Sequence, residues 1–159
     1  TPRRSKLSDT SARTDKGKPP PKWILKTVTR VHTFLYNISG NRWLNTLGGD
    51  EVCFVDMTGA KSGKKLTIPL MYVPHGQEVL LVASMGGAPK NPVWHTNLVK
   101  NPDIEVSYRG DRKKFRARLA TADEKPALWP VCYKAYAPFE AYRKRTTRDI
   151  PIFVCAPAT

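Results

Sequence analysis

The chain lacks several features that would assign it to a common class of protein. None of its apolar runs approaches the roughly 18 residues that a membrane-spanning helix needs. It has neither a GxGxxG turn nor a GxxxxGK[ST] loop, which disfavours the dinucleotide-binding α/β folds. No signal-peptide pattern opens the chain. At 159 residues we expect a single cytoplasmic domain that is long enough to bury a core.

Cysteine is scarce. Cys53, Cys132 and Cys155 are the three in the chain, and their spacing is not that of a metal site. Cys53 and Cys155 lie inside apolar runs, which predicts buried free thiols in a reducing cytosol. No cluster of cysteine and histidine supports a metal site, so we expect none.

Acidic residues are also few, 13 against 27 lysines and arginines, which gives a formal charge of +14. Such a charge restricts the partners more than the fold. Nucleic acid, an anionic membrane surface and a polyanionic small ligand are the open alternatives, beside a solvated basic surface without a partner. For the basic run at 109–118 we favour a solvated strand face. Few aromatic residues alternate with these cations, which disfavours nucleic acid.

The first 38 residues differ from the rest of the chain. Residues 1–21 are polar, basic and end in three prolines, which predicts a flexible basic arm. Apolar residues then recur at helical spacing over 22–38, which predicts an amphipathic helix. This helix could make a peripheral contact with the inner face of the membrane, or pack on the domain or on a partner subunit. We treat residues 22–159 as one domain.

After residue 50 the apolar period becomes that of strands. We expect strands at 51–57, 65–73, 78–84, 104–108, 112–120 and 150–155, and helices at 91–100, from a capping box at 121–124 to 135, and at 138–146. A turn at 74–77 should pair the second strand with the third. Pro69 marks an edge strand or a bulge. The pattern predicts an α+β or mainly β protein, a small antiparallel barrel with covering helices.

Two basic, glycine-containing loops follow strand-like runs. The first, T-G-A-K-S-G-K, offers Lys61, Ser62, Gly63 and Lys64 to a phosphate or a carboxylate. The second, S-M-G-G-A-P-K-N-P-V-W, allows close approach of a flat ligand at Gly86 and Gly87, because glycine has no Cβ and tolerates positive φ. It then enters a helix at Asn91-Pro92. Together they indicate an anionic cofactor.

These blocks, with the Y-x-x-Y…Y pattern and the closing R-D-I-P-I-F-V-C, resemble the deazaflavin-dependent nitroreductase family of actinobacteria, from about Trp23 to Pro157. The resemblance implies a split β-barrel related to flavin reductases and pyridoxamine-phosphate oxidases. It implies reduced coenzyme F420, an 8-hydroxy-5-deazaflavin with a phosphodiester and an oligoglutamate tail, as hydride donor. It also implies that split barrels of this kind dimerise, so we expect a homodimer.

The resemblance implies roles for individual residues. The residues expected to contact the cofactor or to support its pocket are Lys61, Ser62, Gly63, Lys64, Pro69, Met71, Ser84, Met85, Gly86, Gly87, Asn91, Pro92, Trp94 and Asn97. The resemblance places Tyr136, Tyr142 and Ser84 on the substrate side of the site, and each of them has a hydroxyl. We expect Tyr136 to supply the proton or orient the acceptor, with the other two assisting.

The chain departs from the family pattern at several positions. Ala60 and Leu66 stand where the first loop usually has arginine, and Met85 replaces a frequent lysine. Met71 and Phe139 stand where relatives can carry tyrosine, which favours an apolar acceptor, a quinone or an α,β-unsaturated carbonyl, over a nitro compound. The alternatives are a basic binding module without catalysis and a split barrel that binds FMN or haem.

Overall fold

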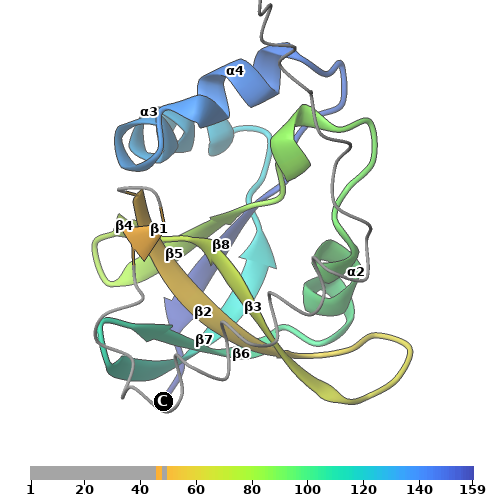
Figure 1. Ribbon diagram of the computed structural model, residues 1–159, viewed down its shortest axis with the longest axis vertical. Coiled ribbons are helices and arrows are strands. Elements are labelled where there is room, and N and C mark those ends of the chain that lie inside the picture. The colour runs from red at the N-terminus through yellow and green to blue at the C-terminus, as the bar shows by residue number, and fades with distance from the viewer. Residues whose placement is uncertain (1–45, 48–49) are drawn as a thin grey trace, which may run out of the picture.

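The computed structural model describes residues 46–47 and 50–159, and their strands form one curled antiparallel sheet (Figure 1). The strands are β1 (Thr46–Leu47), β2 (Asp50–Thr58), β3 (Lys65–Met71), β4 (Val73–His75), β5 (Glu78–Val82), β6 (Asp103–Tyr108), β7 (Asp111–Leu119) and β8 (Ile152–Pro157). The helices are the 3-10 turn η1 (Met85–Gly87), α2 (Val93–Lys100), α3 (Lys125–Ala135) and α4 (Pro138–Lys144). The predicted arm at 1–21 and helix at 22–38, with any membrane contact they make, lie outside the described residues.

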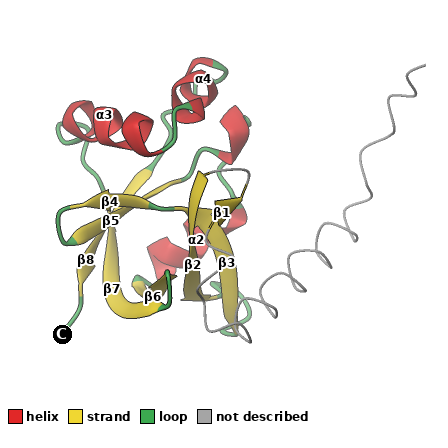
Figure 2. Cartoon of the chain, turned by 60° about the vertical axis from the view of Figure 1, so that its left-hand side comes forward, coloured by secondary structure: helices red, strands yellow, loops and turns green. Residues whose placement is uncertain are grey.

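The strand order along the sheet is β1-β2-β6-β7-β8-β5-β4, and β3 pairs with β2 off this path. Every pairing is antiparallel. The sheet curls on itself, α3 and α4 cross one end of it, and α2 covers one side against β2 and β7 (Figures 1 and 2). This half-barrel with covering helices confirms the predicted fold class.

The pairing predicted for residues 65–73 is wrong. The run divides at Tyr72, whose N–H donates to the carbonyl oxygen of Glu51 at 3.0 Å, so that β3 and β4 are separate strands. The turn at Gly76 joins only β4 to β5, while β3 pairs with β2 from Val52↔Met71 to Thr58↔Lys65. This register has no bulge. Among the described strands β3 pairs with β2 alone, so Pro69 lies on an edge strand, where its missing N–H costs least.

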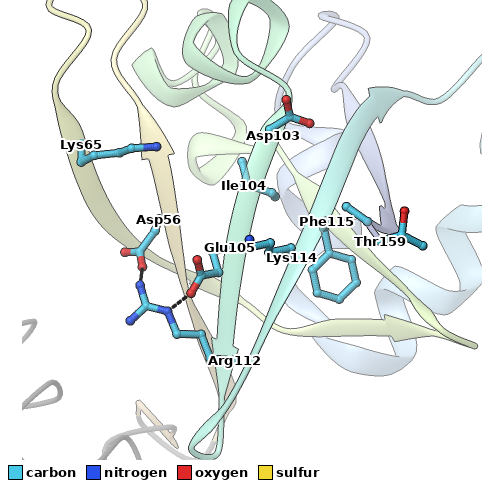
Figure 3. Close-up of a pocket in the computed structure, with 10 residues that line it drawn as sticks. Asp56, Lys65, Asp103, Ile104, Glu105, Arg112, Lys114, Phe115 and Thr159 are labelled. Carbon is cyan, nitrogen blue, oxygen red and sulfur yellow. Dashed lines mark hydrogen bonds and ion pairs between the residues drawn. The ribbon is translucent and has the colours of Figure 1, made fainter.

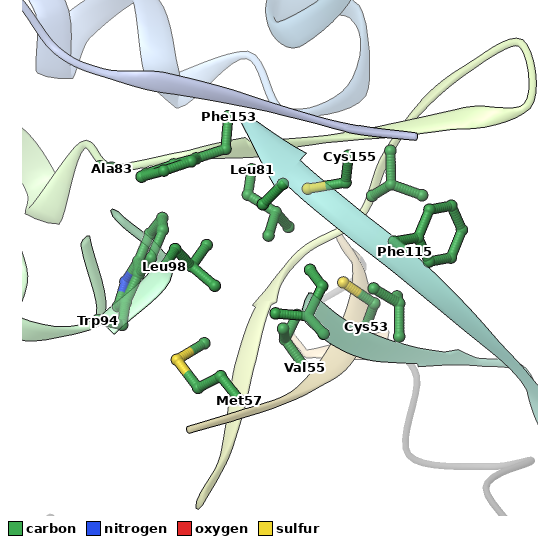
Figure 4. Close-up of a cluster of buried hydrophobic side chains, with 14 residues drawn as sticks. Cys53, Val55, Met57, Leu81, Ala83, Trp94, Leu98, Phe115, Phe153 and Cys155 are labelled. Atoms are coloured by element: carbon green, nitrogen blue, oxygen red, sulfur yellow. The ribbon is translucent and has the colours of Figure 1, made fainter. Parts of the chain in front are cut away.

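Two apolar clusters make up most of the described core. The first fills the inside of the curled sheet and includes Cys53, Cys155, Leu98 and Phe153 (Figure 4). The second lies between β4, β5, β8 and the helices α3 and α4, and contains Cys132. All three cysteines of the chain are buried and free, which confirms the prediction for Cys53 and Cys155.

The local signals in the second half of the chain place its elements well. Thr121 N–H donates to Glu124 Oε2 at 2.8 Å and Glu124 N–H to Thr121 Oγ1 at 3.3 Å, which is the predicted capping box ahead of α3.

The basic run of β7 is a solvated face, as predicted. Arg112 pairs with Asp56 and Glu105, Arg116 with Asp103 and Arg118 with Glu124, while Lys113 pairs with Asp111. No helix in the described residues is long and apolar enough to cross a membrane.

Candidate active site

The glycine loop between β5 and α2 has an unusual backbone. Met85, Gly86 and Gly87 have φ values of 47°, 66° and 80°, three consecutive residues in the left-handed region. Gly87 N–H donates to Ser84 O at 2.9 Å and Ala88 N–H to Met85 O at 3.2 Å, which closes the turn. A Cβ built on Gly86 would meet nothing within 4 Å, so this face of the loop is open to a ligand.

The other face of the loop lies against α4. A Cβ on Gly87 would lie 2.5 Å from the carbonyl oxygen of Tyr142 and 2.9 Å from the Cβ of Arg145. Real Cβ atoms essentially never come closer than 3.0 Å to such neighbours, so only glycine fits here. The contact fixes the loop beside the helix that carries Tyr142.

Ser84, at the start of the loop, is buried with 7% of its surface exposed. Its carbonyl oxygen is an acceptor, yet its hydroxyl forms no hydrogen bond with any residue in the described part of the chain. A buried hydroxyl without a partner is unfavourable and calls for a partner from elsewhere. The feature fits a polar group of a bound ligand at the glycine loop.

The predicted substrate-side tyrosines meet. The hydroxyl oxygens of Tyr136 and Tyr142 are 3.1 Å apart, and both rings pack with Phe139. The hydrogen bond to Tyr142, with desolvation, raises the pKa of Tyr136 to about 12, so this hydroxyl keeps its proton at neutral pH. Met71 contacts the same apolar cluster from the edge strand. The structure therefore brings Tyr136 and Tyr142 together, with Tyr142 on the helix that contacts the glycine loop, and Met71 packs against the same apolar cluster.

The lysine turn lies at the far end of α2. Lys61, Ser62, Gly63 and Lys64 are exposed in the turn between β2 and β3. Neither lysine forms an ion pair with a carboxylate among the described residues. Ser62 Oγ accepts the N–H of Lys64 at 3.2 Å, so part of its capacity is used within the turn. The two lysines are available to an anion.

Asn97 explains how this turn is positioned. Its side chain is buried, Oδ1 accepts the N–H of Ala60 at 2.9 Å, and Nδ2 lies 3.8 Å from Met57 Sδ. Lys100 Nζ donates to Ala60 O at 2.7 Å, and Asn101 Nδ2 to Thr58 O at 3.3 Å. The end of α2 is thus fastened to the lysine turn, and Asn97 supports that turn from beneath.

The remaining predicted residues lie at or under the start of α2. Pro92 is its N-cap, so the helix begins two residues later than predicted. Asn91 is exposed, and its Oδ1 accepts from Arg148. Trp94 is buried in the barrel core, with its ring 5.8 Å from that of Phe153. Pro69 lies on β3 in register with Phe54.

Sequence reasoning missed Arg145 and Arg148. It assigned no role to either residue, yet Arg145 Nη1 donates to Gly86 O at 3.3 Å, and Arg148 donates to several carbonyl groups of the same loop. The only available signal was that Arg148 opens the R-D-I-P-I-F motif.

Two cavities in the described residues lie elsewhere. One of about 630 Å³ is lined by Asp56, Glu105, Arg112 and Phe115 among others (Figure 3), and one of about 450 Å³ by Tyr72 and Tyr108. Neither is lined by the glycine loop or by the tyrosine pair. In the larger cavity Asp56 and Glu105 already pair with Arg112 and Asp103 pairs with Arg116, and none of the buried polar residues of the described chain lines either cavity. The unsatisfied Ser84 and the strained loop therefore identify the candidate site better than cavity size does.

Comparisons with known proteins identify the family of the chain. Residues 28–157 match the profile of a family described as F420H(2)-dependent quinone reductase. The candidate F420H(2)-dependent quinone reductase Rv3178 of Mycobacterium tuberculosis is 40% identical over 97 residues, which are 61% of this chain and 82% of that protein.

Two solved structures are also similar. One described as an F420-H2 dependent reductase (FDR-A) has a TM-score of 0.62 and 36% identity, over 65% of this chain and 92% of that one. Another, described as a domain-swapped dimer, has a TM-score of 0.63 and 32% identity, over 84% of this chain and 96% of that one. By its sequence profile and its fold, this chain belongs to the F420H2-dependent quinone reductase family.

Proposed function

We propose that the chain binds reduced coenzyme F420 along α2 and uses it to reduce an electrophilic acceptor. The observation that carries this proposal is the arrangement along that helix. Gly86, whose Cβ position faces open space, lies in the loop that leads into α2 at Val93, and Lys61 and Lys64, which form no ion pair with a described carboxylate, lie in the turn at the other end of the helix. An eight-residue helix is about 12 Å long at 1.5 Å per residue. A flat ring with a long anionic tail matches a site that is open at one end and cationic at the other.

The chain's own residues suit the ring as well as the tail. Ser84 has a buried hydroxyl that needs a hydrogen-bonding partner, and the backbone at Gly86 permits close approach. When bound, the reduced deazaflavin would supply a hydride to an electrophilic carbon of the acceptor. The protein must then hold the acceptor against the ring, exclude water and deliver one proton to the reduced product.

Tyr136 is the residue that we propose as proton donor. Its hydroxyl is protonated at neutral pH, and it lies 3.1 Å from the hydroxyl of Tyr142. Tyr142 can therefore orient the donor hydroxyl or replace the proton after transfer. A hydride and a proton together complete the two-electron reduction of a quinone to a hydroquinone, or of an enone to a saturated carbonyl.

For the acceptor we propose a quinone or an α,β-unsaturated carbonyl, with nitro compounds as poorer substrates. Phe139, which is buried, packs against both tyrosine rings, and Met71, which is half-buried, packs against the same apolar cluster. Neither side chain has a hydroxyl that could bind a nitro group. Both offer apolar contact to a carbon skeleton.

The test is a titration of the purified apo-protein with F420, followed by tryptophan fluorescence, with FMN in parallel. We expect saturable F420 binding, weak FMN binding, and oxidation of reduced F420 on addition of a quinone. A Lys61→Ala/Lys64→Ala double variant should weaken F420 binding. Lys113→Ala, which removes an ion-paired lysine of the exposed β7 face, should not. Preference for FMN, or binding of neither, would contradict the proposal.

We also propose that the chain forms a homodimer, since a structure similar over most of its length is described as a domain-swapped dimer. Light scattering after size-exclusion chromatography tests this; a monomer at all concentrations would contradict it.

Peripheral membrane contact through residues 1–38 is a separate proposal. Equal, salt-insensitive liposome binding by the full chain and by a chain without these residues would contradict it.

A further inference from the structure

Arg148, which precedes β8, reaches across to the glycine loop. Its Nε donates to Ala88 O at 3.1 Å, Nη1 to Ala83 O at 3.2 Å, and Nη2 to Ser84 O at 3.0 Å. Nη1 also donates to Asn91 Oδ1. The acceptors lie on both sides of the left-handed turn at Met85–Gly87, two residues before it and two after it. One side chain thus holds the loop at several places along its length.

The contacts use the guanidinium group in a way that lysine cannot copy. Arginine has five N–H donors in a rigid plane, and Arg148 uses four of them on separate acceptors. Lysine has three donors on a flexible stem and acts as a point charge. Hydrogen bonds from a charged donor are also stronger than neutral ones. The site therefore requires arginine rather than any cation.

The loop benefits from such support even though Gly87 rests on α4 and Arg145 donates to Gly86 O, because its backbone is strained and its tip is exposed. Met85, a residue with a Cβ, is held at a φ of 47°, and the turn is closed by only two backbone hydrogen bonds, Gly87 N–H to Ser84 O and Ala88 N–H to Met85 O. Left-handed backbone is unfavourable for a residue with a side chain. Met85 and Gly86 are exposed, so burial does not hold them. Without Arg148 the loop would sample other conformations.

We propose that Arg148 is a positioning residue, which holds the glycine loop in its ligand-ready shape before any cofactor arrives. The expected effect on cofactor binding rests on the proposed function, because we place the ring of F420 at this loop. A loop that is only partly in the competent shape weakens the apparent affinity in proportion to that fraction. The effect should therefore fall on the affinity for F420 and not on turnover at saturation.

The experiment compares Arg148→Ala and Arg148→Lys with Arg116→Ala, which removes an exposed ion pair of β7 and is the matched control. The direct readout is hydrogen exchange at the amides of Gly87 and Ala88 in the protein without cofactor. We expect exchange to accelerate by about 10- to 100-fold in Arg148→Ala, somewhat less in Arg148→Lys, and not in the control. The KM for reduced F420 should rise by about tenfold or more in Arg148→Ala, with kcat at saturation nearly unchanged.

Each outcome decides the question. Unchanged exchange at both amides in a folded Arg148→Ala variant would overturn the proposal, as would a loss confined to kcat. If Arg148→Ala does not fold, Arg148→Lys decides by the same readouts. Failure of both to fold would also overturn it, since Arg148 would then serve the whole fold. If the wild-type protein binds no F420, the exchange measurement still tests the positioning role, so the two proposals fail separately.

Discussion

Replacing Gly87 with alanine tests the contact between the glycine loop and α4 most directly. The new Cβ would lie 2.5 Å from Tyr142 O, whereas ordinary contact begins at 3.4 Å, so loop or helix must move by about 0.9 Å. The backbone of Tyr142 resists such movement, because its carbonyl oxygen accepts from Arg145 N–H at 3.2 Å at the end of α4. Overpacking of this kind costs about 1–3 kcal/mol of stability.

The substitution also places a side chain at a φ of 80°, which costs about 1–2 kcal/mol by itself. Gly86→Ala isolates this second cost, because Gly86 has a φ of 66° and nothing within 4 Å of its Cβ position. We therefore expect Gly87→Ala to lose about 1–3 kcal/mol more than Gly86→Ala, or about 2–12 °C in Tm for a chain of this size.

Urea unfolding followed by tryptophan fluorescence, with thermal melts in parallel, measures both variants. Since the clash would push the loop away from Tyr142, Gly87→Ala should also bind F420 more weakly than the wild type. Equal stability of the two variants would refute the reasoning. It would mean that the loop does not rest on α4 as closely as the structure shows.

Three further predictions concern other parts of the chain. Tyr136→Phe should lower kcat by about 100-fold through loss of the proton donor while leaving F420 affinity intact. Tyr133→Phe, three residues earlier on α3, is the control, and equal activity of the two would contradict the assignment. Asn97→Ala should lower the free energy of unfolding by about 1–3 kcal/mol, because it strips a buried acceptor from the lysine turn; no loss on urea unfolding would contradict it. The pKa of Glu124 is lowered from 4.5 to about 2, chiefly by the hydrogen bond from the Arg118 side chain and next by that from the Thr121 backbone. The contribution of Glu124 to folding stability is therefore present above pH 4.5 and is lost as the pH falls towards 2. Glu124→Gln should flatten that acid loss, and an unchanged acid limb in urea unfolding would contradict the pairing.

Local patterns in the sequence predicted the elements, and long-range contacts explain the errors. Alternating apolar residues located the strands, and Thr121 with Glu124 located the start of α3. The partner of β3 was mistaken because the nearest turn, at Gly76, suggested the next strand along the chain. Pairing with β2 depends on a register between residues that no local signal records. The break at Tyr72 depends on the same register.

In the candidate site, too, local motifs predicted some residues, and residues that act through long-range contacts were missed. Tyr136 and Tyr142 were predicted together because they lie six residues apart in one motif, and the structure brings their hydroxyls into contact. Arg148 was missed because its acceptors lie 57–65 residues away and are mostly backbone carbonyls, which every residue has. Only the folded chain shows which carbonyls an arginine can reach.

The three buried cysteines acquire a chemical meaning if the acceptor is a quinone or an enone. Such molecules alkylate thiolates, and the thiolate is the reactive form of cysteine. Burial raises the pKa of both Cys53 and Cys132 to about 12, and it raises that of Cys155 as well, while each residue has 0% of its surface exposed. The folded protein thus offers no reactive thiol to an acceptor of this kind. We therefore expect inactivation by alkylation to be limited by the local unfolding that exposes these cysteines.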